Sequence, residues 1–452
     1  MVFLLYNLMF PFILAAMLPY FLFRMCRRGG YARGFFQRLG WYDAALCARM
    51  SGTPRLWVHA VSVGEAYVAL KFMDEWRQLR PGVSFVMSVN TSTAHALAEQ
   101  SLPPGDVLIY FPLDFPLVLS RVFRMLQPSM LILTECELWP NLIRMCRKRG
   151  IPVMLINGRM SERSFRRYFR FRGLFSQLLT MVDRFCVQGE GDRDRFLDLG
   201  ASAGRISITG SAKYDVALDH QGDPLKAAAI LSAARMTRDD LILLGGSTWP
   251  GEEEILLDYF IRAKSVLPQL KLVLVPRHAE RRKEVVAAIE KRGLSYVQRS
   301  RADLAPEKHE SEVLLVDTTG ELRHLYALAS VIFVGKSLSQ HGGQNIIEPA
   351  VCGKAVVVGP HMENFLEITG EFKQAEAVIQ VGSADELSRI LDQLLSNNLQ
   401  RQAYGDRANA LVSRNRGCVK LSIREAERLL EAAKRTANAG HEKHAKHAKR
   451  WT

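Results

Sequence analysis

The sequence predicts an α/β protein with two doubly wound domains that face a cleft, preceded by an N-terminal membrane anchor helix. Short apolar runs alternate with helical stretches over residues 55–211, and the same alternation restarts at 241 and continues to 359. Strands that alternate with helices form parallel sheets covered on both faces. A polar stretch at 215–224 separates the two series, and a chain of 452 residues is long enough for about two or three domains.

The first 23 residues carry no charged side chain and are mostly apolar. A helix of this length spans a bilayer core of about 30 Å, and proline is tolerated in membrane helices. Arginines mark the basic juxtamembrane segment 24–50, so the positive-inside rule places the rest of the chain in the cytoplasm. We therefore expect residues 1–23 to form an uncleaved single-span anchor or a deeply inserted helix. A buried hairpin of the globular part is the alternative.

The candidate strands set the domain boundaries. In the first domain, residues 51–217, they are 55–61, 83–90, 107–111, 130–135, 153–157, 184–188 and 206–210. In the second domain, residues 218–437, they are 241–246, 271–275, 313–317, 331–335 and 355–359, followed by terminal helices. Residues 438–452 are low in complexity and predict a disordered basic tail, although their three histidines leave metal binding as an alternative.

The net charge of +14 is concentrated in the first half of the chain. Residues 1–217 contain 27 Lys and Arg against 16 Asp and Glu, whereas the remainder contains 33 against 30. The first domain should therefore face an acidic partner, which is nucleic acid, anionic lipid or a phosphorylated substrate. The seven cysteines form no Cys-x-x-Cys pair, which argues against a disulfide framework or structural zinc and favours a reduced cytosolic setting.

A carboxylate, Glu65, lies at the turn between a predicted strand and a predicted helix. Ser62 and Gly64 break the apolar run 55–61, and helical spacing follows from Ala66. This is the place where α/β proteins hold their ligands. Glu65 is therefore a candidate general base, and the alternative is a first-turn residue that only complements the helix dipole.

Two further segments of the first domain bring charged groups to strand ends. Glu135 and Glu137 follow the strand 130–135, and residues two apart fall on the same side of an extended strand. Lys213 follows the last strand of this domain and stands just before the presumed hinge, where it could neutralise a departing phosphate.

The second domain contains the clearest ligand signature. The strand 331–335 leads through the pair Gly342 and Gly343 into a helix with an early carboxylate, Glu348. Paired glycines before a helix let backbone N–H groups approach a phosphate, and an early carboxylate can accept hydrogen bonds from a ribose. The strand ends at 276–278 and 316–321 are expected at the same edge of the sheet as this glycine pair. Their cationic and hydroxyl side chains could bind the ligand, although such residues also occur in ordinary loops.

A basic segment with interleaved aromatic residues lies at 161–172. RNA is one possible partner for this composition. Behind a membrane anchor, anionic lipid head groups suit it better, and a merely solvated basic helix remains open. Its arginines are Arg163, Arg166, Arg167, Arg170 and Arg172.

Taken together in order, these segments resemble the 3-deoxy-D-manno-oct-2-ulosonic acid (Kdo) transferases of lipid A and lipopolysaccharide core biosynthesis. The resemblance extends over both domains and most of residues 1–370. The matching stretches are HAVSVGE, LTECELWPNLI, INGRMSERS, TGSAKYD, LVPRHAERR, DTTGELRHLYALA, and GKSL through HGGQNIIEPA to VGPHMENF.

The resemblance implies an inverting, membrane-anchored glycosyltransferase of the GT-B type, with two Rossmann-like domains and CMP-β-Kdo as the donor. By that analogy Glu65 is the catalytic base, while Glu135 and Lys213 assist the transition state. Residues 51–217 would bind the acceptor and residues 218–437 would bind CMP-Kdo. The residues that would hold the nucleotide are Pro276, Arg277, Thr319, Gly320, Glu321, Asn345, Ile346, Ile347 and Glu348.

The resemblance also implies the partners and the location. The acceptor is a hydroxyl of the lipid A precursor lipid IVA, and the enzyme works at the cytoplasmic side of a bacterial inner membrane rich in anionic lipids, with no nucleic acid, no cofactor and no catalytic metal. Lys336 departs from the family pattern, which commonly has a second glycine there, and its role is open. One rival is another GT-B enzyme that transfers a UDP-linked sugar to a lipid. The other is a membrane-tethered RNA-binding protein.

Overall fold

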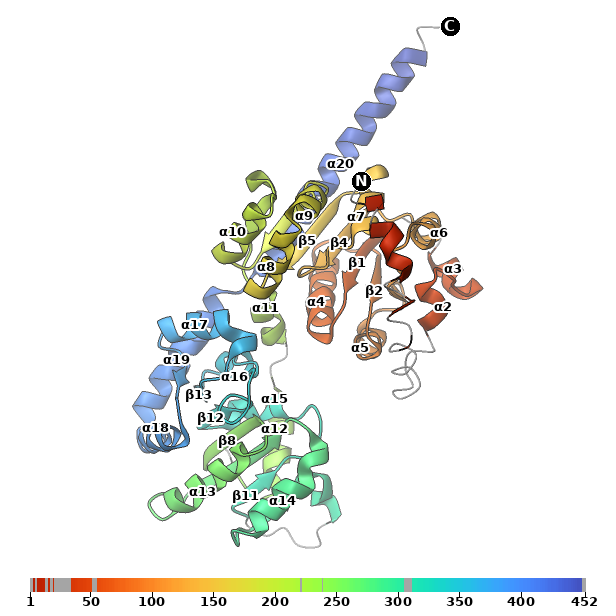
Figure 1. Ribbon diagram of the computed structural model, residues 1–452. Coiled ribbons are helices and arrows are strands. Elements are labelled where there is room, and N and C mark those ends of the chain that lie inside the picture. The colour runs from red at the N-terminus through yellow and green to blue at the C-terminus, as the bar shows by residue number, and fades with distance from the viewer. Residues whose placement is uncertain are drawn as a thin grey trace. The chain divides into compact units, whose positions relative to one another are not determined.

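The computed structural model describes residues 34–50, 55–219, 222–237, 239–304 and 311–448, together with parts of 3–19. The chain divides into two compact units (Figure 1). The first contains Met1–Val216 and Gly417–Thr452, and the second contains Ala217–Arg416. Each unit is built on one parallel β-sheet with helices packed on it, as the sequence predicts.

The first unit contains seven strands and the helices around them. The strands are β1 (Leu56–Ala60), β2 (Phe85–Val89), β3 (Val107–Tyr110), β4 (Met130–Thr134), β5 (Val153–Gly158), β6 (Arg184–Val187) and β7 (Ile206–Ile208). The helices are α2 (Phe35–Arg38), α3 (Ala44–Met50), α4 (Val63–Leu79), α5 (Ser92–Ser101), α6 (Pro116–Leu126), α7 (Pro140–Lys148), α8 (Glu162–Arg170), α9 (Arg172–Leu179), α10 (Glu190–Asp198), α11 (Ala212–Asp219) and α20 (Cys418–Ala448).

The second unit repeats this plan. The strands are β8 (Leu241–Thr248), β9 (Leu270–Pro276), β10 (Tyr296–Gln298), β11 (Val313–Leu315), β12 (Val331–Val334), β13 (Ala355–Val358) and β14 (Ile379–Gln380). The helices are α12 (Pro224–Ser232), α13 (Glu252–Lys264), α14 (Arg282–Glu290), α15 (Leu322–Leu325), α16 (Ile347–Val351), α17 (Leu366–Gln374), α18 (Ala384–Ser396) and α19 (Asn398–Arg414). Every predicted strand is present, and β10 and β14 are additional.

The strand orders create a topological switch point in each sheet. The first sheet runs β3-β2-β1-β4-β5-β6-β7, and the second runs β10-β11-β9-β8-β12-β13-β14. Adjacent strands are parallel, with β1 between β2 and β4 and with β8 between β9 and β12. Open parallel sheets bind ligands at the carboxyl ends of the strands that flank such a point. Ligand sites are therefore expected at the carboxyl ends of β1 and β4 and at those of β8 and β12.

Alternate residues of the central strands supply two cores, one on each face of the first sheet. Trp57 packs against Phe123 on one face, with ring centroids 5.6 Å apart. Its neighbour Val58 belongs to the core on the other face, together with Phe72 of α4. Successive side chains of a strand point to opposite faces, so a run of apolar residues is what a sheet buried on both sides requires.

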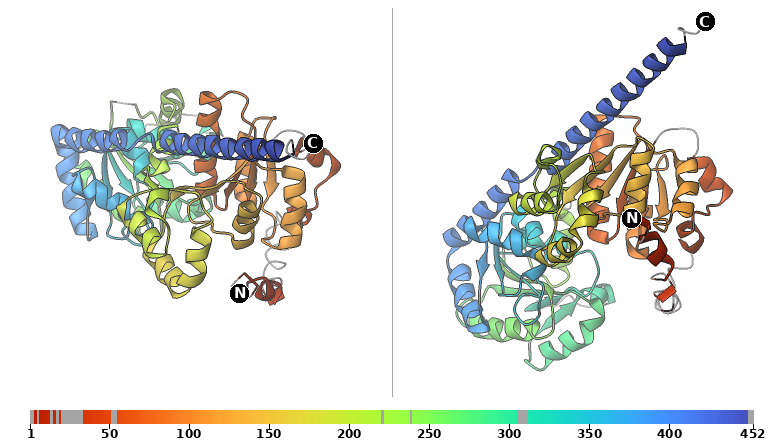
Figure 2. Two further views of the ribbon diagram at one scale, coloured as in Figure 1. Left: turned by 90° about the horizontal axis from the view of Figure 1, so that it is seen from above. Right: turned by 45° about the horizontal axis from the view of Figure 1, so that its top comes forward.

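The last helix, α20, belongs to the first unit (Figure 2). Its residues Ile423 and Ala426 join the core that contains α4. Asp215 of α11 accepts hydrogen bonds from the backbone N–H groups of Gly417 (2.6 Å) and Val419 (2.8 Å), which fixes the start of α20.

The sequence prediction differs from the structure here in two ways. It assigned residues up to 437 to the second domain, because an amphipathic helix does not reveal which core it will cover. It also expected a disordered tail from 438, but α20 continues to Ala448. That segment contains several Ala and Lys residues, which favour helix, and it contains no proline.

The N-terminal segment contacts the rest of the first unit through polar side chains. The Tyr6 hydroxyl donates to Asp114 (3.0 Å), and Asn141 donates to the side-chain oxygen of Asn7 (2.7 Å). Among the residues that the structure describes, no helix is both long and apolar enough to cross a bilayer. Much of the predicted anchor, including residues 20–23, and the first part of the juxtamembrane segment up to 33 lie outside the described residues.

Candidate active site

The turn between β1 and α4 is built around the Glu65 carboxylate. Ser62 is the N-cap of α4 and accepts the Glu65 backbone N–H (3.3 Å), while Glu65 accepts the N–H groups of Ser62 (3.2 Å) and Val61 (2.9 Å). This reciprocal arrangement is a capping box. Glu65 is buried, with only 6% of its surface exposed. The helix-start role considered for Glu65 is therefore real, and any chemical role is additional to it.

The end of β4 meets the same carboxylate. The Thr134 hydroxyl lies 3.0 Å from Glu65 Oε2 and 2.8 Å from the carbonyl oxygen of His59, so its single proton is shared between these two acceptors. The next residue, Glu135, has a positive φ of 53° and donates its backbone N–H to Ile156. The strand has therefore ended before Glu135, and the expectation that Glu135 and Glu137 share one side of an extended strand is wrong in its geometry.

Glu135 and Glu137 nevertheless lie close enough to Glu65 to interact electrostatically. Burial raises the pKa of Glu135, and the negative charge of Glu65 raises it further, while Lys213 and Arg159 act in the opposite direction. Burial and the charges of Glu65 and Glu135 raise the pKa of Glu137 to about 7. Three carboxylates thus gather at the switch point, and for Glu135 and Glu137 desolvation and like charge favour keeping a proton. Strongly shifted groups at such a place are typical of functional sites.

Lys213 reaches the three carboxylates from the start of α11. Asn157, which sequence reasoning missed, positions that helix start. Asn157, at the end of β5, has a positive φ of 52°, and its side-chain oxygen accepts the backbone N–H of Ala212 (3.0 Å) and the amide of Gln188 (3.0 Å). The contact to Ala212 fixes the first turn of the helix that carries Lys213. An asparagine directly after an apolar run was the available signal, because Asn tolerates the left-handed region better than most residues.

His59, in the same motif as Glu65, is a structural residue. It is fully buried, and its ring stacks on Phe111 with centroids 3.9 Å apart. Its Nδ1 lies 2.9 Å from the Ser88 hydroxyl. Burial lowers the pKa of His59 to about 3, so the ring is neutral at physiological pH and supports the turn beneath the carboxylates.

In the second unit, a buried carboxylate shapes the loop that follows β12. Glu252, at the start of α13, is fully buried and accepts the backbone N–H groups of Lys336 (2.8 Å), Ser337 (3.0 Å) and Leu338 (3.0 Å), and also that of Trp249 (2.9 Å). The ends of β8 and β12 are thereby joined at the second switch point. Sequence reasoning did not single out Glu252, because its three partners in the loop after β12 are more than eighty residues away.

The predicted nucleotide residues fall into buried and accessible groups. Asn345 accepts the N–H of Ile347 (3.0 Å) and donates to Glu348 (3.1 Å), so the turn before α16 is internally bonded. Ile346 and Ile347 are fully buried, which leaves only their backbone to meet a ligand. Lys336, whose role was left open, has a φ of 57°, and its ammonium lies 4.9 Å from the ring centre of Trp249.

The other predicted nucleotide residues follow β9 and β11 at the same edge of the sheet. Pro276 ends β9, and Arg277 donates its N–H to Thr248 of β8 (3.0 Å). Tyr326 is buried. Burial and the charge of Glu348 raise its pKa while the charge of Arg277 acts in the opposite direction, so these two groups lie around one ring. Glu321 pairs with Arg299 at 3.3 Å, and Thr319 and Gly320 precede it in the same turn.

The basic segment forms an exposed helix, α8, and the residues just after it. Phe165 and Phe169 contact each other with ring centroids 5.5 Å apart, and Phe169 and Phe171 remain 45% and 58% exposed. All five predicted arginines are exposed, and Arg166 pairs with Glu162 at 3.0 Å. Exposed aromatic and cationic side chains on one surface helix are typical of a contact with lipid or with another acidic partner.

Comparison with known proteins follows the same division of the chain. A family model described as 3-deoxy-D-manno-octulosonic-acid transferase (kdotransferase) matches residues 33–216, and one described as glycosyl transferases group 1 matches residues 267–410. The chain is 31% identical over 390 residues to a 3-deoxy-D-manno-octulosonic acid transferase of Haemophilus influenzae, which covers 86% of this chain and 90% of that protein. It is also 31% identical over 418 residues to the transferase of that name from Bordetella pertussis, with 91% and 95% covered.

Among solved structures, the UDP-GlcNAc 2-epimerase of Neisseria meningitidis matches 84% of this chain and 100% of its own with a TM-score of 0.58. At 15% identity this likeness shows the fold alone. The two parallel-sheet units and the matched family models define a glycosyltransferase of the GT-B class. More narrowly, the chain belongs to the 3-deoxy-D-manno-octulosonic acid (Kdo) transferase family, which confirms the family predicted from its motifs.

Proposed function

We propose that the protein transfers Kdo from CMP-β-Kdo to a hydroxyl of a lipid A precursor, lipid IVA, with inversion at the anomeric carbon and release of CMP. The observation that carries this proposal is the group of three carboxylates and one lysine at the switch point of the first sheet. Family membership supports the sugar, because the relatives are described as Kdo transferases. The exposed basic and aromatic helix α8 supports this acceptor, because such a surface suits a phosphorylated lipid.

In the proposed reaction Glu65 is the base. Its Oε2 receives the Val61 N–H and the Thr134 hydroxyl, whereas Oε1 receives the N–H of Ser62. A carboxylate offers about four lone-pair sites, so Oε1 keeps one for the acceptor hydroxyl. Glu65 takes the hydroxyl proton as the oxygen bonds to the anomeric carbon. The bond from that carbon to the phosphate oxygen breaks on the opposite face, and its electron pair leaves with CMP.

Glu135 and Lys213 are proposed to stabilise the charges that develop on the anomeric carbon and on the departing phosphate. Lys213 acts on the pKa of Glu135, so the lysine ammonium and this carboxylate lie close enough to influence each other. A fixed cation stabilises the phosphate charge that appears as CMP departs. Glu135 keeps that cation in place and holds negative charge near the anomeric carbon, which becomes positive in the transition state.

The second unit is proposed to bind the donor at the carboxyl ends of β8, β9, β11 and β12. Arg277 supplies a cation at the end of β9, and Glu348 supplies an acceptor for ribose hydroxyls. The backbone N–H groups of the turn at 345–347 and of the loop at 319–321 complete the nucleotide site. The rival donor is a UDP-linked sugar.

Donor competition tests this assignment. We expect CMP to compete with CMP-Kdo for the intact protein and UDP to compete far less. Arg277→Ala should weaken CMP binding, whereas Arg282→Ala, an exposed arginine of α14, should leave it unchanged. Equal competition by UDP, or equal binding by both variants, would contradict the assignment.

We also propose that the enzyme works at the cytoplasmic face of a bacterial inner membrane. The N-terminal segment exposes Leu4, Leu8 and Phe12, which are 75%, 64% and 73% accessible, and α8 exposes its arginines. Apolar side chains and cations together bind anionic bilayers. The double variant Arg166→Ala/Arg167→Ala should lose affinity for anionic vesicles and turnover of a membrane-embedded acceptor. Unchanged values for both would remove this surface from the proposal.

A further inference from the structure

Two loops of the second unit are fastened together beside the turn at 345–347. One follows β12 and the other follows β13, and these strands are neighbours in the sheet. The carbonyl oxygen of Ser337 accepts the N–H of His361 (2.9 Å), and the Ser337 hydroxyl accepts the N–H of Gly359 (2.8 Å). At the far end, the carbonyl of Gly342 accepts the N–H of Asn364 (3.0 Å). The backbones therefore hold side chains of the two loops at a set separation.

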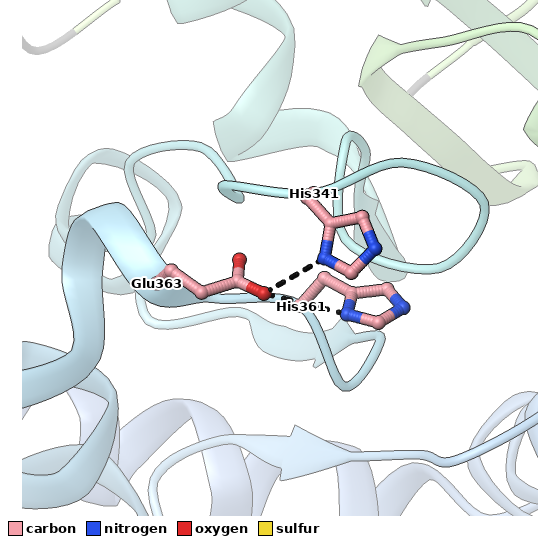
Figure 3. A group of neighbouring side chains, drawn as sticks. All are labelled: His341, His361 and Glu363. Atoms are coloured by element: carbon pink, nitrogen blue, oxygen red, sulfur yellow. Dashed lines mark hydrogen bonds and ion pairs between the residues drawn. The ribbon is translucent and has the colours of Figure 1, made fainter.

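Three of those side chains converge (Figure 3). Glu363 Oε1 lies 2.9 Å from His341 Nδ1 and 3.4 Å from His361 Nδ1. One ring nitrogen of each histidine and one carboxylate oxygen of Glu363 all lie within 4.8 Å of one another. The second oxygen, Oε2, accepts the backbone N–H of Gly342 (2.7 Å), which orients the carboxylate. Figure 3 shows the remaining nitrogen of each imidazole ring directed away from Glu363.

We propose that His341, His361 and Glu363 bind one divalent transition-metal ion of the zinc class, which clasps the two loops and keeps at least one coordination position open to water. Two nitrogens and one carboxylate oxygen are a donor set that Zn²⁺ accepts, and three protein ligands plus water is the usual form of an open zinc site. Donor atoms about 2.1 Å from one tetrahedral ion lie about 3.4 Å apart, close to the two separations observed here.

The free protein is already arranged for this ion. The Glu363 carboxylate is exposed, and its Oε1 already lies within reach of both imidazole rings. Each imidazole ring needs only to place its proton on Nε2, which faces away, to offer the Nδ1 lone pair. The contact between Glu363 and Gly342 N–H then supports the bound ligand, as partners of metal ligands commonly do. The three side chains are partly or fully accessible, so an ion can enter directly.

The inference is independent of the proposed Kdo transfer, and its test uses binding alone. Isothermal titration of the full chain with ZnCl₂ would be carried out in a background where His441, His444 and His447 are replaced by alanine, because the C-terminal histidines could also bind zinc. We expect one ion per chain. His341→Ala and Glu363→Gln should each weaken binding about 10-fold or more. Glu367→Gln, a matched carboxylate on the same segment, should leave the affinity unchanged.

Two further measurements sharpen the result. Co²⁺ should give the visible absorption of a four- or five-coordinate site in the background protein and lose it in Glu363→Gln. Mg²⁺ should show no comparable affinity, because it prefers oxygen ligands. Equal zinc affinity in all variants, a stoichiometry far from one, or equal binding of Mg²⁺ would overturn the proposal. His341 and Glu363 are exposed, so circular dichroism should show both variants folded, and either one alone decides the outcome.

Discussion

Replacing Glu65 by glutamine removes the proposed base and also disturbs the hydrogen bonds that begin α4. The carboxylate accepts two backbone N–H groups, from Val61 and Ser62. In Glu65→Gln an amide NH₂ takes the place of one oxygen, so one of these N–H groups faces another donor. An unsatisfied buried donor costs about 1–3 kcal/mol. We expect the free energy of unfolding to fall by that amount, and the transfer rate to fall about 100- to 10,000-fold for loss of a general base.

A matched variant separates the two effects. Ser62→Ala removes the hydroxyl that accepts the Glu65 N–H (3.3 Å) but keeps the carboxylate. Loss of such a cap costs about 0.5–2 kcal/mol, which is comparable to the cost expected for Glu65→Gln. Urea unfolding gives the two stabilities, and release of CMP at saturating donor and acceptor gives the two rates. If both variants lose stability equally and also lose activity equally, Glu65 is only a capping residue and the proposed mechanism is wrong.

Three further predictions concern other groups of the fold. The pKa of Glu137 is raised to about 7, so its protonated form stabilises the folded state, and that contribution is lost as pH rises from about 4.5 through 7. Glu137→Gln should therefore flatten the fall in unfolding free energy that urea unfolding measures between about pH 5 and 8. An unchanged slope would contradict this prediction. Asp215→Ala leaves the N–H groups of Gly417 and Val419 without their acceptor and should lower the unfolding free energy by about 1–3 kcal/mol. Gly359→Ala places a Cβ about 2.1 Å from the Ser337 carbonyl oxygen, which is too close for the loop to keep its conformation. The variant should therefore destabilise the second unit and weaken CMP binding. Thermal unfolding with and without CMP measures both effects.

The sequence was most informative where a local pattern decides the structure. Apolar runs at even intervals located all the central strands, and the carboxyl ends of parallel strands share an edge, so Glu65, Glu135 and Lys213 could be expected near one another. The strands that were missed, β10 and β14, are short, and their side chains are only half-buried. A buried run made most of the other strands recognisable, whereas β7, which is also only partly buried, was recognised by its two isoleucines.

The features that the sequence did not predict depend on contacts between residues far apart in the chain. The raised pKa of Glu137 comes from burial and from Glu65, which is 72 positions earlier in the sequence. Glu252 and Asn157 shape their sites by accepting N–H groups of loops that only the folded chain brings to them. The return of α20 to the first unit was unpredictable for the same reason, since its apolar face would suit either core.

Transfer of Kdo from CMP-β-Kdo to a lipid A precursor is the reaction that we propose for this chain. Incubating the intact protein with CMP-Kdo and lipid IVA, and then weighing the lipid by mass spectrometry, tests it directly. We expect an acceptor heavier by one or more whole Kdo residues, CMP released in equal amount, and product lower by about 100-fold or more from Glu65→Gln over the same period. An unmodified acceptor from active, folded protein, together with sugar transfer from a UDP-linked donor, would contradict it.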